Sequence, residues 1–411
     1  MQQHATTPRP RIRRQLALAF GAFILLGATD GATGVLLPSL QAYYHVSKGT
    51  VGFLFLALTT GYMIAGLSSG LLVARLGQRR FLMLGAVAFA VGAASFSVRP
   101  PFVVVLATTV ALGVGFAVID AGLNAAITAL PDNTTPLNNL HAFYGIGGFL
   151  GPIVASGVLA IGFPWSVVYI LWAALSLALL AGFRLLFTAN PVGAQSTPAL
   201  PSTEQPNLFT ATLRLRVVWL AALFLLFYVG AEISLGSWSY SFLTEVRQHG
   251  ALLSGWAVSG YWLGITLGRL TLARLAARLR VDNQRLIRYC LLGAVIGVAC
   301  IWVAPIGAVS AFGLWLTGYS LGPIFPTTIA LVPSLVPPRL VPSAVGFLAS
   351  TGSMGAALFP WLAGNLAHAF GLWSLLPYVN ALLLIMSGGW LALQRSSVIV
   401  GGRPETYQST T

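Results

Sequence analysis

Long apolar runs recur along the whole chain, and they limit its possible folds more than any other feature. Each run has about 20 residues, enough to cross a hydrocarbon core of about 30 Å. Backbone polar groups in lipid must bond within their own segment, which favours helices. We count twelve runs: 15–37, 50–74, 81–98, 101–128, 140–162, 165–187, 215–244, 252–277, 286–305, 307–333, 342–367 and 372–394. The sequence therefore predicts an all-α membrane protein with twelve transmembrane helices.

The composition supports an integral membrane protein. Of the 411 residues, 57% are hydrophobic and only 7% are charged, whereas soluble proteins carry about 25% charged residues. The first run follows basic residues, as in a signal peptide. It is nevertheless too long, contains Asp30 and lacks a clear cleavage site, so we interpret it as a retained span.

The net charge of +14 is distributed by side of the membrane and does not indicate nucleic acid binding. Between the spans, one set of alternate loops holds only Lys48, Arg99 and Arg247. The other set carries nearly all the arginines, from Arg9 to Arg403. This positive-inside pattern predicts that both termini lie in the cytoplasm and that the protein resides in a cell membrane, inner or plasma. Twelve spans, an even number, likewise place both termini on the same side of the membrane.

The sequence contains no sign of catalytic or cofactor chemistry. Cys290 and Cys300 fall ten positions apart in one predicted span, too far along a helix for a disulfide. We find no metal-ligating cluster and no phosphate-binding loop of the Walker type. No Ser/His/Asp arrangement converges at one depth. We therefore expect no enzyme activity, no cofactor and no metal.

A polar segment divides the spans six and six. Residues 188–214 are rich in Pro, Ser and Thr, and we interpret them as a mostly unstructured cytoplasmic linker. The predicted domains are a six-helix bundle over 1–187 and a second over 215–411.

The two halves echo each other in sequence. GLSSGLLVARLGQRR (66–80) is paralleled by GITLGRLTLARLAARLR (264–280), and YGIGGFLGPIVASG (144–157) by TGSMGAALFPWLAG (351–364). Glycines four apart, such as Gly66 with Gly70 and Gly264 with Gly268, allow close approach of helices. Matching positions in matching helices indicate a duplicated unit, and two halves facing a central site are typical of transporters.

The end of the second span resembles a family signature. In GLLVARLGQRR, Gly70, Arg75, Gly77 and Arg79 match the cytoplasmic motif of the major facilitator superfamily, while its Asp position is Ala74. The resemblance implies a gating role for this motif.

Further stretches are similar to the fucose permease-like branch of sugar–cation symporters. They are GATDGATGVLLPSL (27–40), GVGFAVIDAGLNAAI (113–127), LNNLHAFYGIGGFLGP (137–152), FYVGAEISLGSWSYSFL (227–243) and YWLGITLGRL (261–270).

Asp120 stands in VIDAGLNAA, within an otherwise apolar helix, and shares a helix face with Asn124 four residues later. A carboxylate in hydrocarbon is costly and is a functional candidate by default. Desolvation disfavours the ionised form of a carboxyl group, so Asp120 can exchange a proton as its hydration changes. We predict that it is the proton-coupling site. Aligned on the shared Asn, it also falls where the branch carries its coupling acid. The alternative is a structural role, in which the carboxyl group stays protonated and only forms hydrogen bonds.

Asp30 and Glu232 are the other acids inside spans. In the fucose carrier the acid of the first span stands about a turn further on, near Gly34. Asp30 therefore performs a related proton-coupling role from one turn deeper, or it binds substrate hydroxyls.

Glu232 lies in GAEISLGSWS, where Gly230 and Gly236 indicate a broken or flexible helix. Acids beside aromatic rings suit a sugar, with acceptors for hydroxyls and a flat apolar face for the ring. The predicted substrate-binding residues are Glu232, Asn124, Trp238, Tyr261 and Trp262.

Two basic side chains have two interpretations each. His141 begins the predicted fifth span and serves in gating or pH sensing, or else it caps or anchors the helix. Arg269 is either the partner of a buried acid or a snorkelling side chain, and we favour the second.

The sequence thus predicts a proton-coupled secondary transporter in the lipid bilayer, most simply a symporter of a small polar solute such as a sugar, working as a monomer. Its two halves would rock about a midplane site. Sodium is an alternative to the proton, since Asp and Asn supply oxygen ligands. A proton-driven exporter of drugs or metabolites is the second interpretation, and a transporter-like membrane sensor ranks below it.

Overall fold

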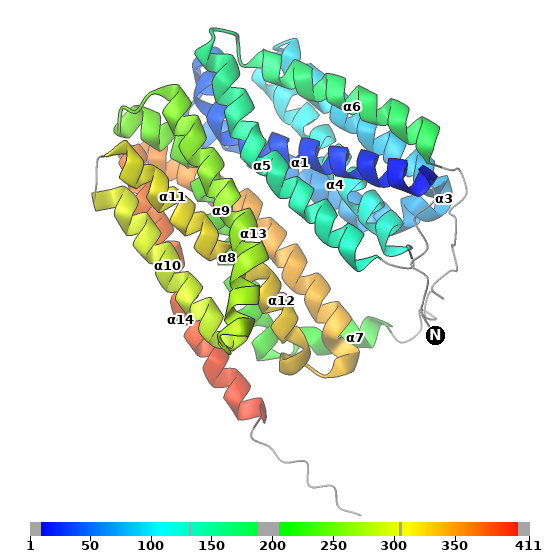
Figure 1. The fold of residues 1–411 in the computed structure, drawn as a ribbon, viewed down its shortest axis with the longest axis vertical. Coiled ribbons are helices and arrows are strands. Elements are labelled where there is room, and N and C mark those ends of the chain that lie inside the picture. Colours follow the sequence, from blue (N-terminus) through cyan, green and yellow to red (C-terminus); the bar gives the residue numbers. More distant parts are fainter. Residues whose placement is uncertain (1–9, 131–132, 188–204, 304–305, 402–411) are drawn as a thin grey trace, which may run out of the picture.

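The computed structural model describes residues 10–130, 133–187, 205–303 and 306–401, and every regular element within these ranges is helical (Figure 1). The terminal segments 1–9 and 402–411, and part of the predicted linker, 188–204, lie outside the described residues.

The first half consists of α1 (Pro10–Tyr44), the short α2 (Lys48–Val51), α3 (Phe53–Ser97), α4 (Phe102–Thr128), α5 (Thr134–Ala160) and α6 (Ser166–Leu186). The 45-residue α3 contains two spans, because the chain turns at Gly77 with φ 73° and ψ 159°. Only glycine adopts a positive φ without a steric penalty from Cβ. The second and third predicted spans therefore meet at this residue.

The second half begins with α8 (Arg216–Ser241), which continues as the π-helix η1 (Phe242–Val246). Then come α9 (Ala251–Arg278), α10 (Asn283–Val303), α11 (Gly307–Leu321), α12 (Ile324–Leu335), the 3₁₀ turn η2 (Pro338–Leu340), α13 (Val341–Phe370), the 3₁₀ turn η3 (Leu372–Ser374) and α14 (Leu375–Gly401). The predicted tenth span is broken into α11 and α12.

Length and composition confirm the membrane-spanning character. Ten helical stretches of the described chain are long and apolar enough to cross a membrane, and one of them, 48–97, contains both spans of α3. The helix α9 has 28 residues and is less apolar, since it carries Arg269, Arg274 and Arg278. With α9 and the double α3, the prediction of twelve spans is confirmed.

The predicted linker is not wholly unstructured. Its residues Gln205–Leu213 form the helix α7, and the Trp219 indole nitrogen donates a hydrogen bond of 2.8 Å to the Leu213 carbonyl. The segment was predicted to be mostly unstructured, and this helix is the part of it that has regular structure.

Glycines bring helices together within each half. On α9, Gly264 and Gly268 face the backbone of Trp315 and Tyr319 on α11, so that any larger side chain would collide. Small residues at such crossings permit close backbone packing in membranes. Gly66 and Gly70 differ: nothing lies within 4 Å of the position that a Cβ would take at either residue. The expected close approach at these two glycines is absent from this conformation.

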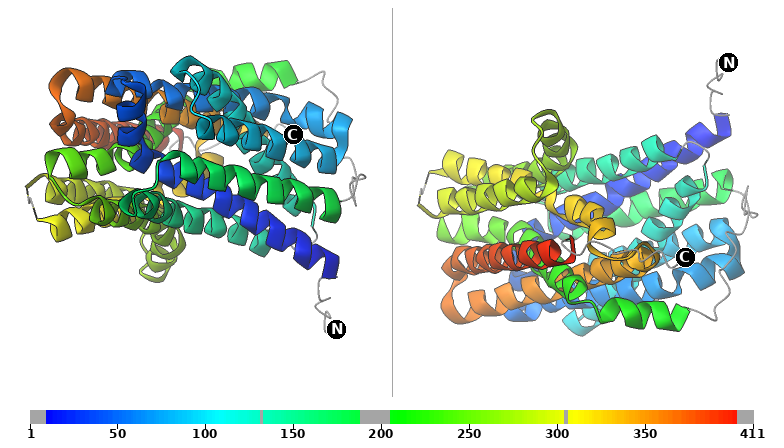
Figure 2. Two further views of the ribbon diagram at one scale, coloured as in Figure 1. Left: turned by 90° about the horizontal axis from the view of Figure 1, so that it is seen from above. Right: turned by 90° about the horizontal axis from the view of Figure 1, so that it is seen from below.

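The two halves are in contact along α5 and α9, where Gly145 faces Thr266 and Gly255 faces Ser156, and they also meet at one end of the molecule. We call it the predicted outer end, because it carries the loops with few arginines, and we call the opposite end the predicted cytoplasmic end. At the predicted outer end, Lys48 Nζ lies 2.8 Å from Glu245 Oε2, and Gly34 packs against the backbone of Gly236 and Ser237. Figure 1 shows α1 and α3–α6 as one group and α8–α14 as the other, and in Figure 2 the long helices run in one common direction.

Candidate functional site

Asp120 is held by two side chains. The Tyr62 hydroxyl, on α3, donates a hydrogen bond of 2.9 Å to Asp120 Oδ2. The Asn124 amide, one turn further along α4, donates to Asp120 Oδ1 at 2.9 Å and to the Asp120 carbonyl oxygen at 3.0 Å. Asn124 is thus a direct partner of the acid. Hydrogen bonds to a carboxylate stabilise its charged form, and this arrangement lets the group exist with or without its proton.

Asp30 has an analogous partner. The Tyr144 hydroxyl, on α5, donates to Asp30 Oδ2. One turn further along α1, a Cβ at Gly34 would lie 2.6 Å from the Ser237 carbonyl oxygen. No side chain fits at Gly34 in this helix crossing, so an acid at that position is excluded in this conformation.

An aromatic ring lies between these two pairs. The Phe116 ring contacts Tyr62 edge-on, with centroids 6.1 Å apart, and Tyr144 in the same manner at 6.4 Å.

His141 lies near Asp120. Its ring packs edge-on against Phe23, with centroids 5.7 Å apart, and lies within electrostatic range of Asp120. Because α5 begins at Thr134, His141 is about two turns inside the helix and does not cap it.

Glu232 forms an ion pair with Arg269. Arg269 Nη2 lies 3.2 Å from Glu232 Oε1, and Arg269 Nε donates to the Gly322 carbonyl at 3.1 Å. The Glu232 side chain is 8% exposed and that of Arg269 is 42% exposed, so the pair remains open on the arginine side. The favoured interpretation of Arg269 as a snorkelling side chain is wrong, because its guanidinium is bound at two positions.

The break in the tenth span explains the second bond of Arg269. In a regular helix the Gly322 carbonyl would accept a hydrogen bond from residue 326, but Pro326 has no N–H. The carbonyl is therefore free to accept from Arg269. The sequence GPIFP, at 322–326, predicts that this carbonyl lacks its helical donor, although it does not show which side chain will donate to it instead.

The acids of the two halves belong to one electrostatic group. Asp30 lies within electrostatic range of Glu232, and Tyr144 within range of Arg269. Tyr261, fully buried, donates a 2.8 Å hydrogen bond to the Glu232 carbonyl oxygen. The α9 residue Trp262 packs on Gly148 of α5 and is 8% exposed, and its indole nitrogen has no hydrogen-bond partner.

Trp238 does not join this group. It is fully buried, and its indole nitrogen donates a 2.9 Å hydrogen bond to the Pro360 carbonyl on α13. The helix near it is not broken, since α8 runs without interruption through Gly230 and Gly236. The alternative, a flexible helix, stays a prediction. Both glycines instead accommodate aromatic rings, those of Phe359 and Trp262 respectively.

The cytoplasmic motif lies apart from the acids. Gly77 makes the turn between the two spans of α3, and the adjacent Gln78 donates to the Gly122 carbonyl on α4, which fixes the turn to the bundle. Arg75 is exposed, Arg79 is partly buried, and Gly70 has open space beside it.

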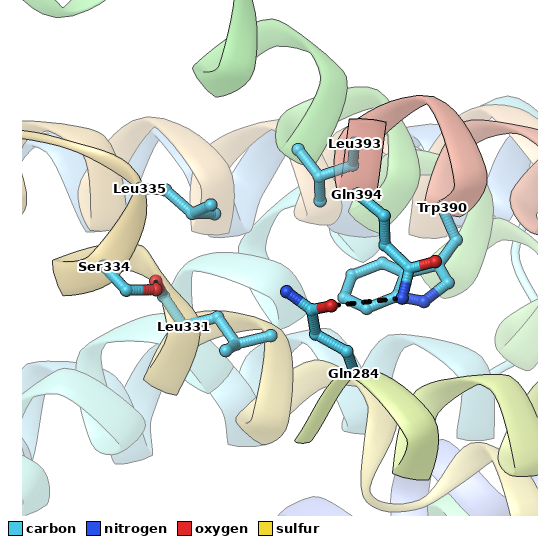
Figure 3. A pocket seen from close by; sticks show the side chains of 7 residues that line it. All are labelled: Gln284, Leu331, Ser334, Leu335, Trp390, Leu393 and Gln394. Carbon is cyan, nitrogen blue, oxygen red and sulfur yellow. Dashed lines mark hydrogen bonds between the residues drawn. The ribbon is translucent and has the colours of Figure 1, made fainter. Parts of the chain in front are cut away.

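A separate cavity of about 240 Å³ lies in the second half (Figure 3). It is lined from α10, α12 and α14, by Gln284, Leu331, Ser334, Leu335, Trp390, Leu393 and Gln394. The Gln394 amide donates to Gln284 across it at 3.5 Å. It shares no residue with the acid group.

Sequence reasoning missed Tyr62, Tyr144 and Phe116. Each is an aromatic residue in an apolar run, and such residues are usually ordinary core or lipid contacts. The signal for the tyrosines was a phenolic hydroxyl next to glycine, in GYMIAG and FYGIGG. Only the packing of α3 on α4 and of α1 on α5 reveals their partners.

Comparison with known proteins gives consistent matches over nearly the whole chain. The sequence model of the Major Facilitator Superfamily matches residues 18–313 and 248–406. The chain is 27% identical to the Saccharomyces cerevisiae "Bypass of stop codon protein 6", covering 92% of this chain and 81% of the relative. It is 23% identical to a Brucella abortus glucose/galactose transporter, covering 85% and 87%.

Solved structures show the same fold. A bacterial homologue of the human lysosomal transporter Spinster, inward-facing and unoccupied, gives a TM-score of 0.82 at 14% identity, covering 96% of this chain and 98% of the other. A variant of the Escherichia coli fucose:proton symporter gives 0.59 at 18% identity, covering 94% and 99%. The twelve spans, the paired halves and the match of the family model lead to one conclusion: this chain belongs to the Major Facilitator Superfamily.

Proposed function

We propose that this transporter moves a small polar solute, a sugar, together with protons by alternating access. The observation that carries the proposal is the acid group: three intramembrane carboxyls are each bonded to a side chain on another helix, and Asp30 of the first half lies within electrostatic range of Glu232 of the second. Intramembrane acids facing a bundle interior mark ion or proton pathways. The glucose/galactose and fucose:proton relatives support the sugar and the proton.

The acids divide into two roles. Among the residues that the structure describes, the hydrogen-bond donors to Asp120 and Asp30 are all neutral: Tyr62 and Asn124 for the first, and Tyr144 for the second. They are therefore the proposed proton carriers. Glu232 is neutralised by Arg269, so the pair presents both acceptors and donors to a solute without requiring a proton.

Trp262 supplies a further contact in the proposed site. Its indole nitrogen is a buried donor without a partner, and its ring lies where α5 meets α9. Buried polar groups are nearly always hydrogen-bonded. A solute hydroxyl would satisfy this donor, while the flat ring would pack against the apolar face of a pyranose. Tyr261 positions Glu232 through its backbone carbonyl.

Contacts between the halves favour an inward-facing state for this structure. Lys48 with Glu245, and Gly34 with Ser237, join them at the predicted outer end. Gly66 and Gly70 on α3 and Gly346 on α13, all in the parts of their helices nearer the predicted cytoplasmic end, have nothing within 4 Å. Rocking of the halves would separate the contacts at the predicted outer end and bring other helices against these three glycines.

Transport in proteoliposomes tests the proposal. With radiolabelled D-glucose outside, the wild-type protein should accumulate sugar and acidify the lumen. Asp120→Asn should weaken this coupled flux, because the proton bound at Asp120 is lost, yet retain sugar counterflow, which needs no net proton movement. Asp282→Asn is the matched control, because Asp282 pairs with Arg285 at an exposed position. Wild-type coupled rates in Asp120→Asn would refute the assigned role, and a requirement for sodium in place of the proton gradient would identify the other ion.

The direction of transport needs a separate test. Export by antiport would use the same acids. Growth of a sugar-uptake mutant on low glucose after expression of this protein is expected for a symporter. Increased resistance to drugs without rescue of growth would instead identify an exporter.

A further inference from the structure

We propose that two protons accompany each solute molecule, one bound at Asp30 and one at Asp120, because the two acids form equivalent carboxyl–tyrosine pairs. The inference rests on the proposed proton-coupled function and specifies its stoichiometry. It follows from the placement of the pairs, from the ring that separates them and from the charge of the group.

The pairs are equivalent in topology. The first half consists of two helix triplets, α1 with the two spans of α3, and α4 with α5 and α6. Asp30 is on the first helix of one triplet and is bonded by Tyr144, on the second helix of the other. Asp120 is on the first helix of the second triplet and is bonded by Tyr62, on the second helix of the first. Nested three-helix repeats of this kind relate equivalent positions in such halves.

Each pair can take up its own proton. Among the described residues, no hydrogen bond joins the two carboxyls, and each has a separate tyrosine donor. The Phe116 ring contacts both tyrosines edge-on and lies between them. Two carboxyls that shared one proton would need direct contact. Here the protons would be bound separately.

The charge of the group requires both protons when the site is closed. Asp30, Asp120 and Glu232 are acids, and Arg269 is the one arginine bonded to any of them among the described residues. A neutral imidazole at His141, which lies in range of Asp120, adds no charge to this group, whereas a protonated one would take the place of one of the two protons. With all acids ionised, the group therefore has two excess negative charges. Asp30 and Asp120 are partly exposed in this structure. When the halves close over them, each uncompensated charge would be buried at a cost of several kcal/mol.

Two protons make the group neutral, and a neutral sugar leaves this balance unchanged. At each acid one carboxylate oxygen accepts a proton from water on the outer side and forms an O–H bond. After the halves rock, this bond breaks and the proton returns to water on the inner side. The tyrosine hydroxyls keep their protons throughout and act as positioning residues. Glu232 keeps Arg269 as its partner and needs no proton.

The ratio of protons to sugar molecules can be determined from the D-glucose gradient at which the net flux reverses. Proteoliposomes are clamped at zero membrane potential, and the sugar gradient that stops net flux is found for a pH difference of one unit. A ratio of two requires about a 100-fold sugar gradient, and a ratio of one about tenfold. A wild-type ratio of one overturns the inference and leaves proton coupling intact. Sugar flux without any proton movement would instead refute the proposed function.

Variants assign the two protons. Asp30→Asn and Asp120→Asn should each reduce the ratio to one, whereas His141→Gln should leave it at two. A ratio of two in either Asn variant would overturn the assignment. Infrared difference spectra between pH 9 and pH 5 provide a test without solute or transport. The wild-type protein should gain two intramembrane carboxylic acid bands, and each Asn variant should lack a different one. Loss of both bands in a single variant, or of neither, contradicts separate sites.

Discussion

Each intramembrane carboxyl of this protein accepts a hydrogen bond from a side chain on a different helix. Tyr62 binds Asp120, Tyr144 binds Asp30, and Arg269 binds Glu232. Hydroxyl donors leave the charge of an acid free to change, whereas a guanidinium fixes it. At the scale of residues, the identity of the donor therefore distinguishes the proposed proton carriers from the proposed solute contact.

Removal of a tyrosine hydroxyl should impair proton-driven sugar uptake more than sugar counterflow. Tyr144→Phe and Tyr62→Phe each delete a hydrogen bond to an acid, an interaction of about 1.5–3 kcal/mol when one partner is charged. We expect proton-driven D-glucose uptake to fall roughly tenfold or more, in line with 1.4 kcal/mol per factor of ten. Counterflow should change little. Tyr289→Phe, on the exposed face of α10, is the control. Equal losses of uptake and counterflow would indicate a purely structural role.

The Glu232–Arg269 pair should behave as a unit in solute binding. Glu232→Gln leaves Arg269 without its carboxylate and should raise the KM for D-glucose by about tenfold, since an unsatisfied group costs about 1–3 kcal/mol. The exposure of Arg269, at 42%, keeps the loss below that of a fully buried pair. The double variant Glu232→Gln, Arg269→Gln should lose less than the sum of the single variants. Strict additivity in this double-mutant cycle would show that the pair does not act together.

At the scale of elements, apolar length predicted most helices because the bilayer sets a minimum span. The predicted 101–128 corresponds to α4, Phe102–Thr128, and 252–277 to α9, Ala251–Arg278. The two places where the helices differ from the prediction have local causes. Pro323 and Pro326 divide the tenth span, and the glycines at 230 and 236, which were interpreted as signs of a broken or flexible helix, instead accommodate aromatic rings in an unbroken one.

The acids were visible in the sequence because a charge inside an apolar run stands out. Asp30, Asp120 and Glu232 could therefore be identified without a structure, and the i, i+4 spacing brought Asn124 to Asp120. Their partners Tyr62 and Tyr144 were not predictable, because each lies on another helix and contact depends on how the helices pack. For Arg269 the sequence offered a buried acid as one of two interpretations but did not show which acid.

The turn within α3 gives a prediction at the scale of elements. Gly77 has φ 73° and ψ 159°, a backbone conformation essentially restricted to glycine, where a side chain costs about 1–3 kcal/mol. Gly77→Ala should lower the thermal unfolding midpoint of the detergent-purified protein. Gly388→Ala on α14 is the matched control, since nothing lies within 4 Å of a Cβ there and alanine favours a helix. An unchanged midpoint in Gly77→Ala, with correct folding, would show that the turn tolerates a side chain.

At the scale of the whole molecule, the two halves are joined at one end by both charge and close packing. The ion pair of Lys48 and Glu245 connects α2 with η1, and Gly49 and Gly52 pack on Asn365 and Trp361 of α13. Glycine contacts of this kind depend on shape and persist only while the halves are together. The ion pair adds a long-range attraction that salt can screen.

Loss of the ion pair should shift the equilibrium toward opening at the predicted outer end. Its side chains are 20% and 39% exposed, so the interaction is worth about 0.2–1 kcal/mol and the population should change by no more than about fivefold. Spin labels at Phe163→Cys and Ile306→Cys, with Cys290 and Cys300 replaced by alanine, report the distance between the halves. Lys48→Ala should increase the fraction of long distances, and the swap Lys48→Glu, Glu245→Lys should restore the wild-type distribution. If neither variant changes the distances, closure depends on the glycine contacts alone. High salt should then also leave the wild-type distribution unchanged, because shape-dependent packing is not screened.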